Sequence, residues 1–428
     1  MGDQDYEWRP ILDGELASRC RSVISDILTE LGKPEHSPQP IGLASGMAGR
    51  ALSFHYLGRA RHDPALEAQG EFWLNRAAEM LQEGVHDPSL YNGFTGLAWV
   101  FQHIHGHQEE DALSDVDHGL LELLKHSPWT GDYDLVFGHV GFGVYALDRL
   151  PSDSGRTILE RVLNHLEATK VQMPEGLTWH TAPVLLPPWQ RENYSEGYYN
   201  LGLAHGVPGV IALLGLIHHA GIQRDRVLSL LEGAVKWLIA QHRPDGTGSC
   251  FGTAVSTDPE EGGDTRPSRI AWCYGDLGLA VALLMAARSI QRGDWEVQAL
   301  EIARHAALRP METAGDRDGG FCHGAAGNAH LFNRLYQATG EAQFREAALR
   351  WFDRLFSHRV EGRGIAGFSA FHPSMPGDTR EDPWVPKVGI LEGVAGIALC
   401  LQAGLGGPTP DWDIPLLCHL SPRSMPNL

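Results

Sequence analysis

Basic residues are scarce in this sequence. Its 428 residues include 34 lysines and arginines against 53 aspartates and glutamates, which gives a formal net charge of -19. A surface that binds nucleic acid or an anionic membrane needs clustered positive charge, so this composition argues against both. We therefore expect no nucleic-acid partner. The negative charge would attract a basic peptide, although an acidic balance is also common in soluble proteins.

Long apolar runs are also missing. No uninterrupted apolar stretch reaches the roughly 20 residues that a membrane-spanning helix needs. The first ten residues, MGDQDYEWRP, are polar and acidic and lack the apolar core of a secretory signal. The sequence thus predicts no integral membrane segment and a cytoplasmic location.

Cysteine is rare as well. The chain has six cysteines, none of them in a Cys-x-x-Cys pair, which argues against a disulfide framework. Cys20 and Cys400 stand in apolar helical patterns and are expected to be small core residues. We expect no role for Cys250, which lies in a glycine-rich loop, or for Cys418, which lies near the C-terminus.

The other two cysteines share one local pattern. It reads Trp272-Cys273-Tyr274-Gly275 in one place and Phe321-Cys322-His323-Gly324 in the other. Two thiols and one imidazole suit zinc, and three protein ligands leave the fourth tetrahedral position open, as in catalytic sites. The pattern predicts an enzyme that activates a thiol or a water on zinc.

The same glycine pattern recurs along the whole chain. A Gly-x-x-Gly followed by small or apolar residues occurs seven times, and such self-similarity at about the length of one helical hairpin is typical of repeat architectures. We call each occurrence a glycine frame. The frames begin at Gly46, Gly93, Gly138, Gly206, Gly275, Gly324 and Gly393.

Two kinds of helical pattern alternate between the frames. Segments with apolar residues at i, i+3, i+4 and i+7 predict amphipathic outer helices, and the apolar runs that follow the frames predict buried inner helices. Seven such pairs indicate a single all-α domain over residues 1–428, an α/α toroid with about seven inner and seven outer helices. Closure of the ring is an inference, since an open solenoid has the same period. The outer segments include Leu12–Leu31, Gly155–Lys170, Asp225–His242 and Glu341–His358, and the inner ones Val207–Ile217 and Leu277–Ala287.

The frames also predict where the site lies. Glycine would permit unusual backbone angles and close backbone approach where a loop enters an inner helix. The helix N-termini would favour thiolates. Cys273, Cys322, His323 and His205, which come just before frames, would therefore converge at one end of the ring.

Two long segments interrupt the alternation of outer and inner helical segments. Residues 173–200 are rich in proline, tryptophan and tyrosine, and residues 245–268 in glycine, aspartate and threonine. Both come before an inner helix, so we expect loop excursions over the active-site end. The first reads as an extended or β-like peptide-binding excursion, with a plain surface loop as the alternative. Residues 406–428 are expected to form a C-terminal tail packed on the surface.

Three segments resemble one family. They are Leu203-Ala204-His205-Gly206, Arg269 through Gly275, and Cys322-His323-Gly324. They look like the LanC-type lanthionine cyclases, the bacterial lanthipeptide cyclases with their LanC-like relatives, and the seven frames extend the likeness over nearly the whole chain. The resemblance implies an α/α toroid with one zinc ion. It also implies addition of cysteine thiols to dehydroalanine or dehydrobutyrine, which forms the thioether rings of lanthipeptides.

The resemblance also implies roles for single residues. Cys273, Cys322 and His323 match the zinc ligands, His205 the active-site histidine, and Asp134 the aspartate that acts with it. Packing remains an alternative for the aromatic residues, and a helix N-cap for Asp134. Asp276 departs from the family and would add a carboxylate near the site. Arg269, Trp272 and Tyr274 match residues that shape the pocket.

Three functions remain open at this point. The first is a lanthionine cyclase in lantibiotic maturation, acting on a dehydrated precursor peptide with a separate dehydratase and an exporter as partners. The second is a LanC-like enzyme that adds glutathione or another small thiol to dehydroamino acids in proteins; Tyr274 looks bacterial and argues mildly against it. The third, a carbohydrate-active toroid or a binding scaffold, is disfavoured by the two cysteines and the histidine.

Overall fold

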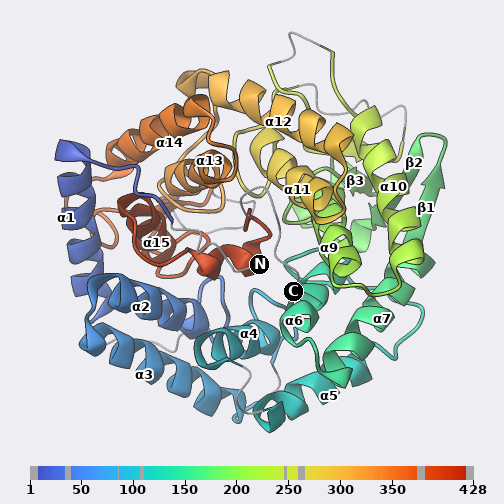
Figure 1. The fold of residues 1–428 in the computed structure, drawn as a ribbon, viewed down its shortest axis with the longest axis horizontal. Coiled ribbons are helices and arrows are strands. Elements are labelled where there is room, and N and C mark those ends of the chain that lie inside the picture. Colours follow the sequence, from blue (N-terminus) through green and yellow to red (C-terminus); the bar gives the residue numbers. More distant parts are fainter. Residues whose placement is uncertain are drawn as a thin grey trace, which may run out of the picture.

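The protein is a closed ring of helices in two layers. The computed structural model describes residues 8–33, 40–84, 86–106, 110–244, 248–258, 266–373 and 381–420. Figure 1 shows an inner circle of helices surrounded by an outer circle. The predicted α/α toroid is confirmed.

Amphipathic helices form the outer circle. In the last of them, the buried residues Phe344, Ala347, Ala348, Trp351 and Phe352 recur at i, i+3, i+4, i+7 and i+8, which is the pattern of a helix with one face on the core. Within the described residues the outer helices number seven. They are α1 (Gly14–Leu31), α3 (Pro64–Leu81), α5 (Ser114–Leu123), α7 (Asp153–Thr169), α10 (Arg224–Ala240), α12 (Gly293–Leu308) and α14 (Ala342–Leu355).

Helices that are buried on nearly all sides form the inner circle. In α11 (Asp276–Ser289), every residue except Arg288 is buried, as the apolar run predicts. Each inner helix starts directly after the first glycine of a frame. The other inner helices in the described part of the chain are α2 (Met47–Arg61), α4 (Phe94–His105), α6 (His139–Asp148), α9 (Val207–His219), α13 (Ala325–Thr339) and α15 (Val394–Leu405).

Short elements connect the two circles. They include the single-turn helix α8 (Pro188–Arg191) and two strands that pair as a small ribbon, β5 (Ala370–Phe371) and β6 (Trp384–Val385). The 3₁₀ turns are η1 (Glu110–Leu113), η2 (Pro183–Leu185), η3 (Met311–Thr313), η4 (Phe356–His358) and η5 (Asp411–Leu416).

Six backbone hydrogen bonds between described residues link neighbouring frames of the ring, and between the second and third frames α4 packs against α6. The residues just before successive frames donate and accept in sequence, and the bond from Leu391 N to Ala44 O (3.2 Å) connects the last frame to the first. Ile11 N also donates to Gly404 O (3.0 Å), which fastens the N-terminal segment to α15. The ring is therefore closed, and the open solenoid is excluded. The other bonds run from Leu135 N to Ala204 O, Ala204 N to Cys273 O, Cys273 N to Cys322 O, Cys322 N to Leu391 O, and Ala44 N to Tyr91 O.

Glycine is required in the frames mainly by close approach. A Cβ atom on Gly138 would lie 2.1 Å from Asp132 O, and one on Gly141 would lie 2.5 Å from Leu135 O. The φ angle of Gly138 is -128°, which any residue can adopt. Among the seven leading glycines, only Gly275 has a positive φ, +95°. The expected freedom of backbone angle thus applies to one frame, whereas the close approach is general.

Replacement of Gly275 by alanine should destabilise the protein. The new Cβ would lie 1.8 Å from Arg269 O at a positive φ, so strain and overpacking together should lower the free energy of unfolding by more than about 2 kcal/mol. Gly119→Ala is the matched control, because its Cβ meets nothing within 4 Å in the exposed part of α5; this change should stabilise by about 0.5–1 kcal/mol. Urea unfolding measures both, and equal midpoints would contradict the close-approach account.

A small antiparallel sheet connects the two loop excursions. Its order is β1 (Lys170–Met173), β2 (Gly176–Thr181), β3 (Tyr198–Asn200) and β4 (Ala254–Ser256). β3 pairs with β2 from the first excursion and with β4 from the second. The β-like character predicted for residues 173–200 is therefore confirmed, while residues 245–247 and 259–265 of the second excursion lie outside the described part.

The C-terminal tail fills the centre of the ring, so its predicted place on the surface is wrong. Trp412 and Leu416 are at most 2% exposed, and the final segment lies within the inner circle in Figure 1. Tyr91 Oη donates to Pro415 O and Trp272 Nε1 to Leu416 O, both at 2.8 Å. The prolines and polar residues of the tail suggested a surface loop. Its apolar side chains instead pack into the lumen, the space inside the inner circle of helices. Residues 421–428 lie outside the described part.

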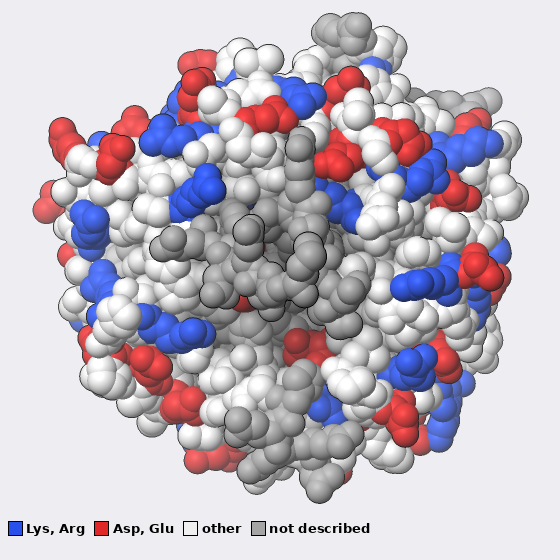
Figure 2. Space-filling model, viewed as in Figure 1, with Lys and Arg blue, Asp and Glu red and all other residues white. Residues whose placement is uncertain are grey.

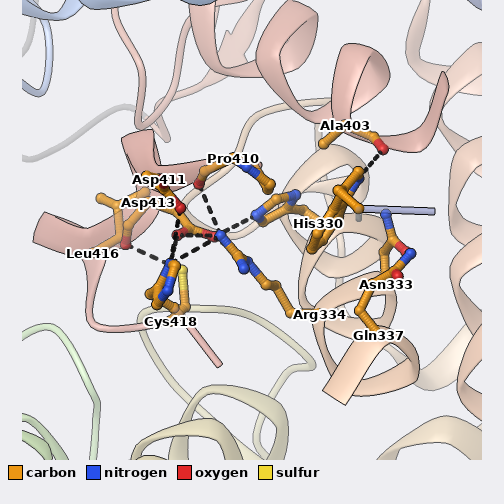
Figure 3. A network of polar contacts seen from close by, with 12 residues as sticks. His330, Asn333, Arg334, Gln337, Ala403, Pro410, Asp411, Asp413, Leu416 and Cys418 are labelled. Atoms are coloured by element: carbon orange, nitrogen blue, oxygen red, sulfur yellow. Dashed lines mark hydrogen bonds and ion pairs between the residues drawn. The ribbon is translucent and has the colours of Figure 1, made fainter. Parts of the chain in front are cut away.

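One buried ion pair holds the tail. Asp413 Oδ2 accepts from Arg334 Nε (2.6 Å) and from His330 Nε2 (2.7 Å), and Arg334 Nη2 also donates to Pro410 O (2.8 Å). Figure 3 shows these contacts converging on Asp413 from α13. Both charged side chains are at most 1% exposed, so each depends on the other for compensation of its charge.

Asp413→Ala should therefore be strongly destabilising. It leaves the Arg334 guanidinium buried without a counter-charge, which typically costs about 3–5 kcal/mol. Asp353→Ala is the control, since the Asp353–Arg19 pair is exposed and such pairs contribute at most about 1 kcal/mol. Chemical unfolding should separate the two variants clearly. A similar small effect of both would show that the tail does not depend on this pair.

Charges of both signs cover the outer helices. Arg292 pairs with Glu232 and Asp294, and Arg304 pairs with Glu341. On the face drawn in Figure 2, blue and red side chains alternate around the rim. Among the helices that the structure describes, none combines the length and the apolar character needed to cross a bilayer.

Candidate functional site

The structure brings Cys273, Cys322 and His323 together. One possible ligand atom from each lies within 4.8 Å of the other two. The two cysteines precede neighbouring frames, and Cys273 N donates to Cys322 O (3.2 Å). The backbone ring thus makes neighbours of residues that are far apart in the sequence.

These three residues fit a metal ion. Tetrahedral zinc holds sulfur at about 2.3 Å and nitrogen at about 2.0 Å, so its ligand atoms are separated by roughly 3.4–3.8 Å. The observed upper limit of 4.8 Å between the ligand atoms is compatible with this spacing. The donor set of two thiols and one imidazole is typical of zinc and leaves one coordination position for another ligand.

The two cysteines compete for one proton. The Cys322 thiol donates a hydrogen bond to Cys273, and His323 adds a second, so the pKa of Cys273 lies well below its usual range although burial opposes this. The bond to Cys273 and burial together raise the pKa of Cys322 well above its usual range. A bound divalent cation would take the place of the shared proton and favour two thiolates.

Asp318 lies next to the histidine of the cluster. Its Oδ2 lies 3.7 Å from His323 Nε2, which would leave Nδ1 for a metal. Backbone N–H groups of Gly320 and Phe371 each donate to this carboxylate at 2.9 Å. Such carboxylate–histidine pairs commonly fix metal-binding imidazoles. Sequence reasoning missed Asp318, because its contacts come from residues on both sides of the frame.

His205 and Asp134 form a hydrogen-bonded pair. His205 Nδ1 lies 2.6 Å from Asp134 Oδ2. Burial lowers the pKa of His205, but the hydrogen bond and the negative charge of Asp134 outweigh it, so the pKa is raised overall. Asp134 Oδ1 also accepts from Phe137 N (2.7 Å), whereas the N-cap of α6 is Gly138. Asp134 therefore holds its loop and the imidazole at once.

Aromatic rings fix the imidazole plane. The rings of Phe137 and Tyr274 both stack on His205, at centroid distances of 5.9 and 6.3 Å. Asn200 Nδ2 donates to Tyr274 Oη (3.0 Å), and burial raises the pKa of this phenol well above its usual range. Tyr274 is thus a neutral side chain. Its ring packs on His205, and its backbone directly follows Cys273.

The position before the first glycine defines the mouth of the ring. In every frame the side chain at this position is partly or fully exposed. In most frames the side chain one residue earlier in the chain is buried. This regularity identifies Phe137 and Glu392, which sequence reasoning missed; comparing the frames position by position would have found both. The seven mouth residues are Ser45, Asn92, Phe137, His205, Tyr274, His323 and Glu392.

Three other residues singled out in the sequence lie outside the cluster and the His205–Asp134 pair. Arg269 is exposed and helps to lower the pKa of Cys273 through its positive charge, after the larger effects of Cys322 and His323. Trp272 has no exposed surface, so it supports the cysteine loop from behind and cannot itself line a pocket. Asp276, which the sequence predicted to add a carboxylate near the site, is fully buried and accepts from Cys250 N and Phe251 N.

Comparisons with known proteins agree with this geometry. Residues 37–417 match the family described as lanthionine synthetase C-like protein. The chain belongs to this family. The resemblance noted in the sequence is thereby confirmed.

The LanC-like chain is similar to two eukaryotic proteins in sequence and to one solved structure in fold. A zebrafish (Danio rerio) protein named glutathione S-transferase LANCL1 is 25% identical over 375 residues, 83% of this chain and 85% of the relative. The Arabidopsis thaliana LanC-like protein GCL1 is 23% identical over 54% of this chain and 48% of its own length. The structure of nisin cyclase superimposes with a TM-score of 0.73 over 95% of this chain and 98% of that one, at 18% identity, which shows a shared toroid.

Loss of the proposed ligands should remove one metal ion. Cys322→Ser combined with His323→Ala deletes two of three donors, so the purified protein should hold about one equivalent of metal less than the native chain. Cys20→Ala is the control, since this buried cysteine lies in α1, away from the cluster. Elemental analysis after chelator-free purification measures the difference. Equal metal contents would contradict a metal at this cluster.

Proposed function

We propose that this LanC-like protein is a zinc-dependent lanthionine cyclase. It would add cysteine thiols to dehydroalanine or dehydrobutyrine residues of a dehydrated lanthipeptide precursor, with a separate dehydratase and an exporter as partners. The observation that supports this most is the placement of two cysteines and a histidine beside an Asp-paired histidine at one mouth of the ring. Membership in the LanC-like family supports the same chemistry.

Zinc bound by Cys273, Cys322 and His323 would supply the Lewis acidity that deprotonates a thiol in its open position and keeps it nucleophilic. In the reaction a C–S bond forms at the β-carbon and the π-bond of the dehydroamino acid breaks. Its electron pair passes to the α-carbon, which must then receive a proton. The thiol loses one proton and the α-carbon gains one, so the reaction needs no other reactant.

His205 is suited to move this proton. Nδ1 donates to Asp134, and the imidazole side chain is 34% exposed, so Nε2 can exchange a proton with the substrate. Asp134 would stabilise the imidazolium form and orient the ring. Tyr274 would keep the ring plane fixed, Arg269 would stabilise the negative charge that develops on the acceptor, and Trp272 would support the loop.

Transfer of glutathione is the second candidate. The zebrafish relative named glutathione S-transferase LANCL1 is covered over 85% of its length, and the same residues would activate a small thiol. In this case the acceptor would be a dehydroamino acid in another protein. The two functions differ in the source of the thiol and share the site chemistry.

One peptide can distinguish the two functions. A synthetic peptide with one dehydroalanine and one cysteine is incubated with the protein, zinc and glutathione. Ring closure removes the free thiol without a change in mass, which alkylation and mass spectrometry detect together. Addition of glutathione raises the mass by one tripeptide and favours the second candidate. Failure of both reactions with the metal-loaded protein would sink the proposed function.

His205→Asn should slow thiol addition without loss of metal. Removal of a positioned general acid–base group typically costs about 10²–10⁴-fold in rate, whereas the three metal donors remain. His118→Asn is the matched control, since this side chain is 76% exposed on α5 and its replacement should leave the rate unchanged. Undiminished turnover by the His205 variant would rule out proton transfer by His205.

A further inference from the structure

We propose that the chain binds a second transition-metal ion, of the zinc type, at Cys250, Asp276 and His305. The three residues come from the loop that follows α10, the first residue of α11, and α12. One possible ligand atom from each lies within 4.8 Å of the other two. None of them belongs to the cluster of Cys273, Cys322 and His323.

The spacing and the donor atoms fit zinc. His305 Nδ1 lies 3.5 Å from Asp276 Oδ2, close to the roughly 3.4 Å that separates nitrogen and oxygen ligands on tetrahedral zinc. A thiolate and a carboxylate together carry two negative charges, which a divalent cation neutralises. Thiolate, imidazole and carboxylate are all common zinc ligands.

Asp276 can bind a metal in addition to its present partners. Its two oxygens each accept one backbone N–H, from Cys250 (2.8 Å) and Phe251 (3.0 Å). A carboxylate has about four acceptor positions, so further positions remain. The simpler interpretation, a carboxylate at the α11 N-terminus that holds the 250–251 loop, explains Asp276. It accounts for the Cys250 backbone as well, but it does not require the Cys250 thiol and the His305 imidazole of α12 to lie within ligand distance of the same carboxylate.

The cluster opens onto a cavity of about 370 Å³. Cys250 and His305 line this cavity together with His242, Gln298 and Glu301. The His305 side chain is 49% exposed, whereas Asp276 is fully buried. A metal there would have three protein ligands and one accessible position, which a water or a small anionic or thiol ligand could occupy.

The second site would also stiffen the first turn of α11. Asp276 follows Cys273 by three residues, and the 250–251 loop leads directly into β4. A metal that binds all three residues would fasten the second loop excursion to α11 and α12. Binding to the folded form alone stabilises a protein in proportion to the logarithm of ligand concentration.

Metal stoichiometry tests the proposal. The full-length protein is saturated with zinc, desalted and analysed for metal, next to variants of each cluster. We expect about two equivalents in the native chain and about one in either Cys250→Ser or Cys322→Ser/His323→Ala. Adding His305→Ala to the latter should remove the last equivalent. His242→Ala is the matched control, because His242 lines the same cavity without being a ligand, and it should retain two.

Cobalt and thermal unfolding give independent readouts. With cobalt, the Cys322→Ser/His323→Ala variant should show a thiolate-to-metal charge-transfer band that disappears in a further Cys250→Ser change. Added zinc should raise its unfolding temperature unless His305 is also replaced. If the native chain binds one equivalent and the folded Cys322→Ser/His323→Ala variant binds none, the second site does not exist. Circular dichroism verifies that each variant is folded.

Discussion

Close crossing of loops over helix starts is the constraint on which the structure depends. In each frame the loop passes the first turn of an inner helix so closely that a Cβ atom would collide with a backbone carbonyl, as at Gly138 and Gly141. Backbone hydrogen bonds between neighbouring loops then close the ring from Leu391 to Ala44. Because every loop crosses in the same register, the residue before the first glycine always reaches the same mouth. The backbone position is thus the same in all seven frames, and the type of side chain decides what each mouth residue can do.

The order of the frames around the ring separates two chemical tasks. His205, Tyr274 and His323 occupy equivalent positions in three consecutive frames. The proposed metal ligands Cys322 and His323 are therefore on one side of Tyr274, and the proposed proton-transferring pair of His205 and Asp134 is on the other. The phenol ring stacks on the imidazole, so the spacing between the two tasks is fixed by packed side chains. An addition reaction needs this arrangement, because the nucleophile and the proton must reach neighbouring carbon atoms.

The sequence predicted the parts of this architecture that repeat. The helical period separated inner from outer helices, and the glycine register located Cys273, Cys322, His323 and His205. Closure was not predictable, since an open solenoid has the same local pattern and only contacts between the two ends of the chain, such as the one from Leu391 to Ala44, distinguish them. The tail was misplaced because its composition resembles a surface loop, whereas the empty lumen that receives Trp412 exists only in the folded ring. The full burial of Trp272 and Asp276 was not predictable, because proximity in sequence to Cys273 says nothing about side-chain direction.

Filling of the lumen has a consequence for how a substrate reaches the site. Tyr91 and Trp272 donate to the carbonyl groups of Pro415 and Leu416, so this part of the tail lies directly behind the loop that carries Cys273. The mouth therefore remains as the side on which the described site residues are exposed. The four-stranded sheet is connected to this mouth through Asn200, the last residue of β3, which hydrogen-bonds to Tyr274. Both proposed functions act on a dehydroamino acid within a polypeptide, so an extended acceptor that lay along the sheet would reach the ring beside Tyr274 in either case.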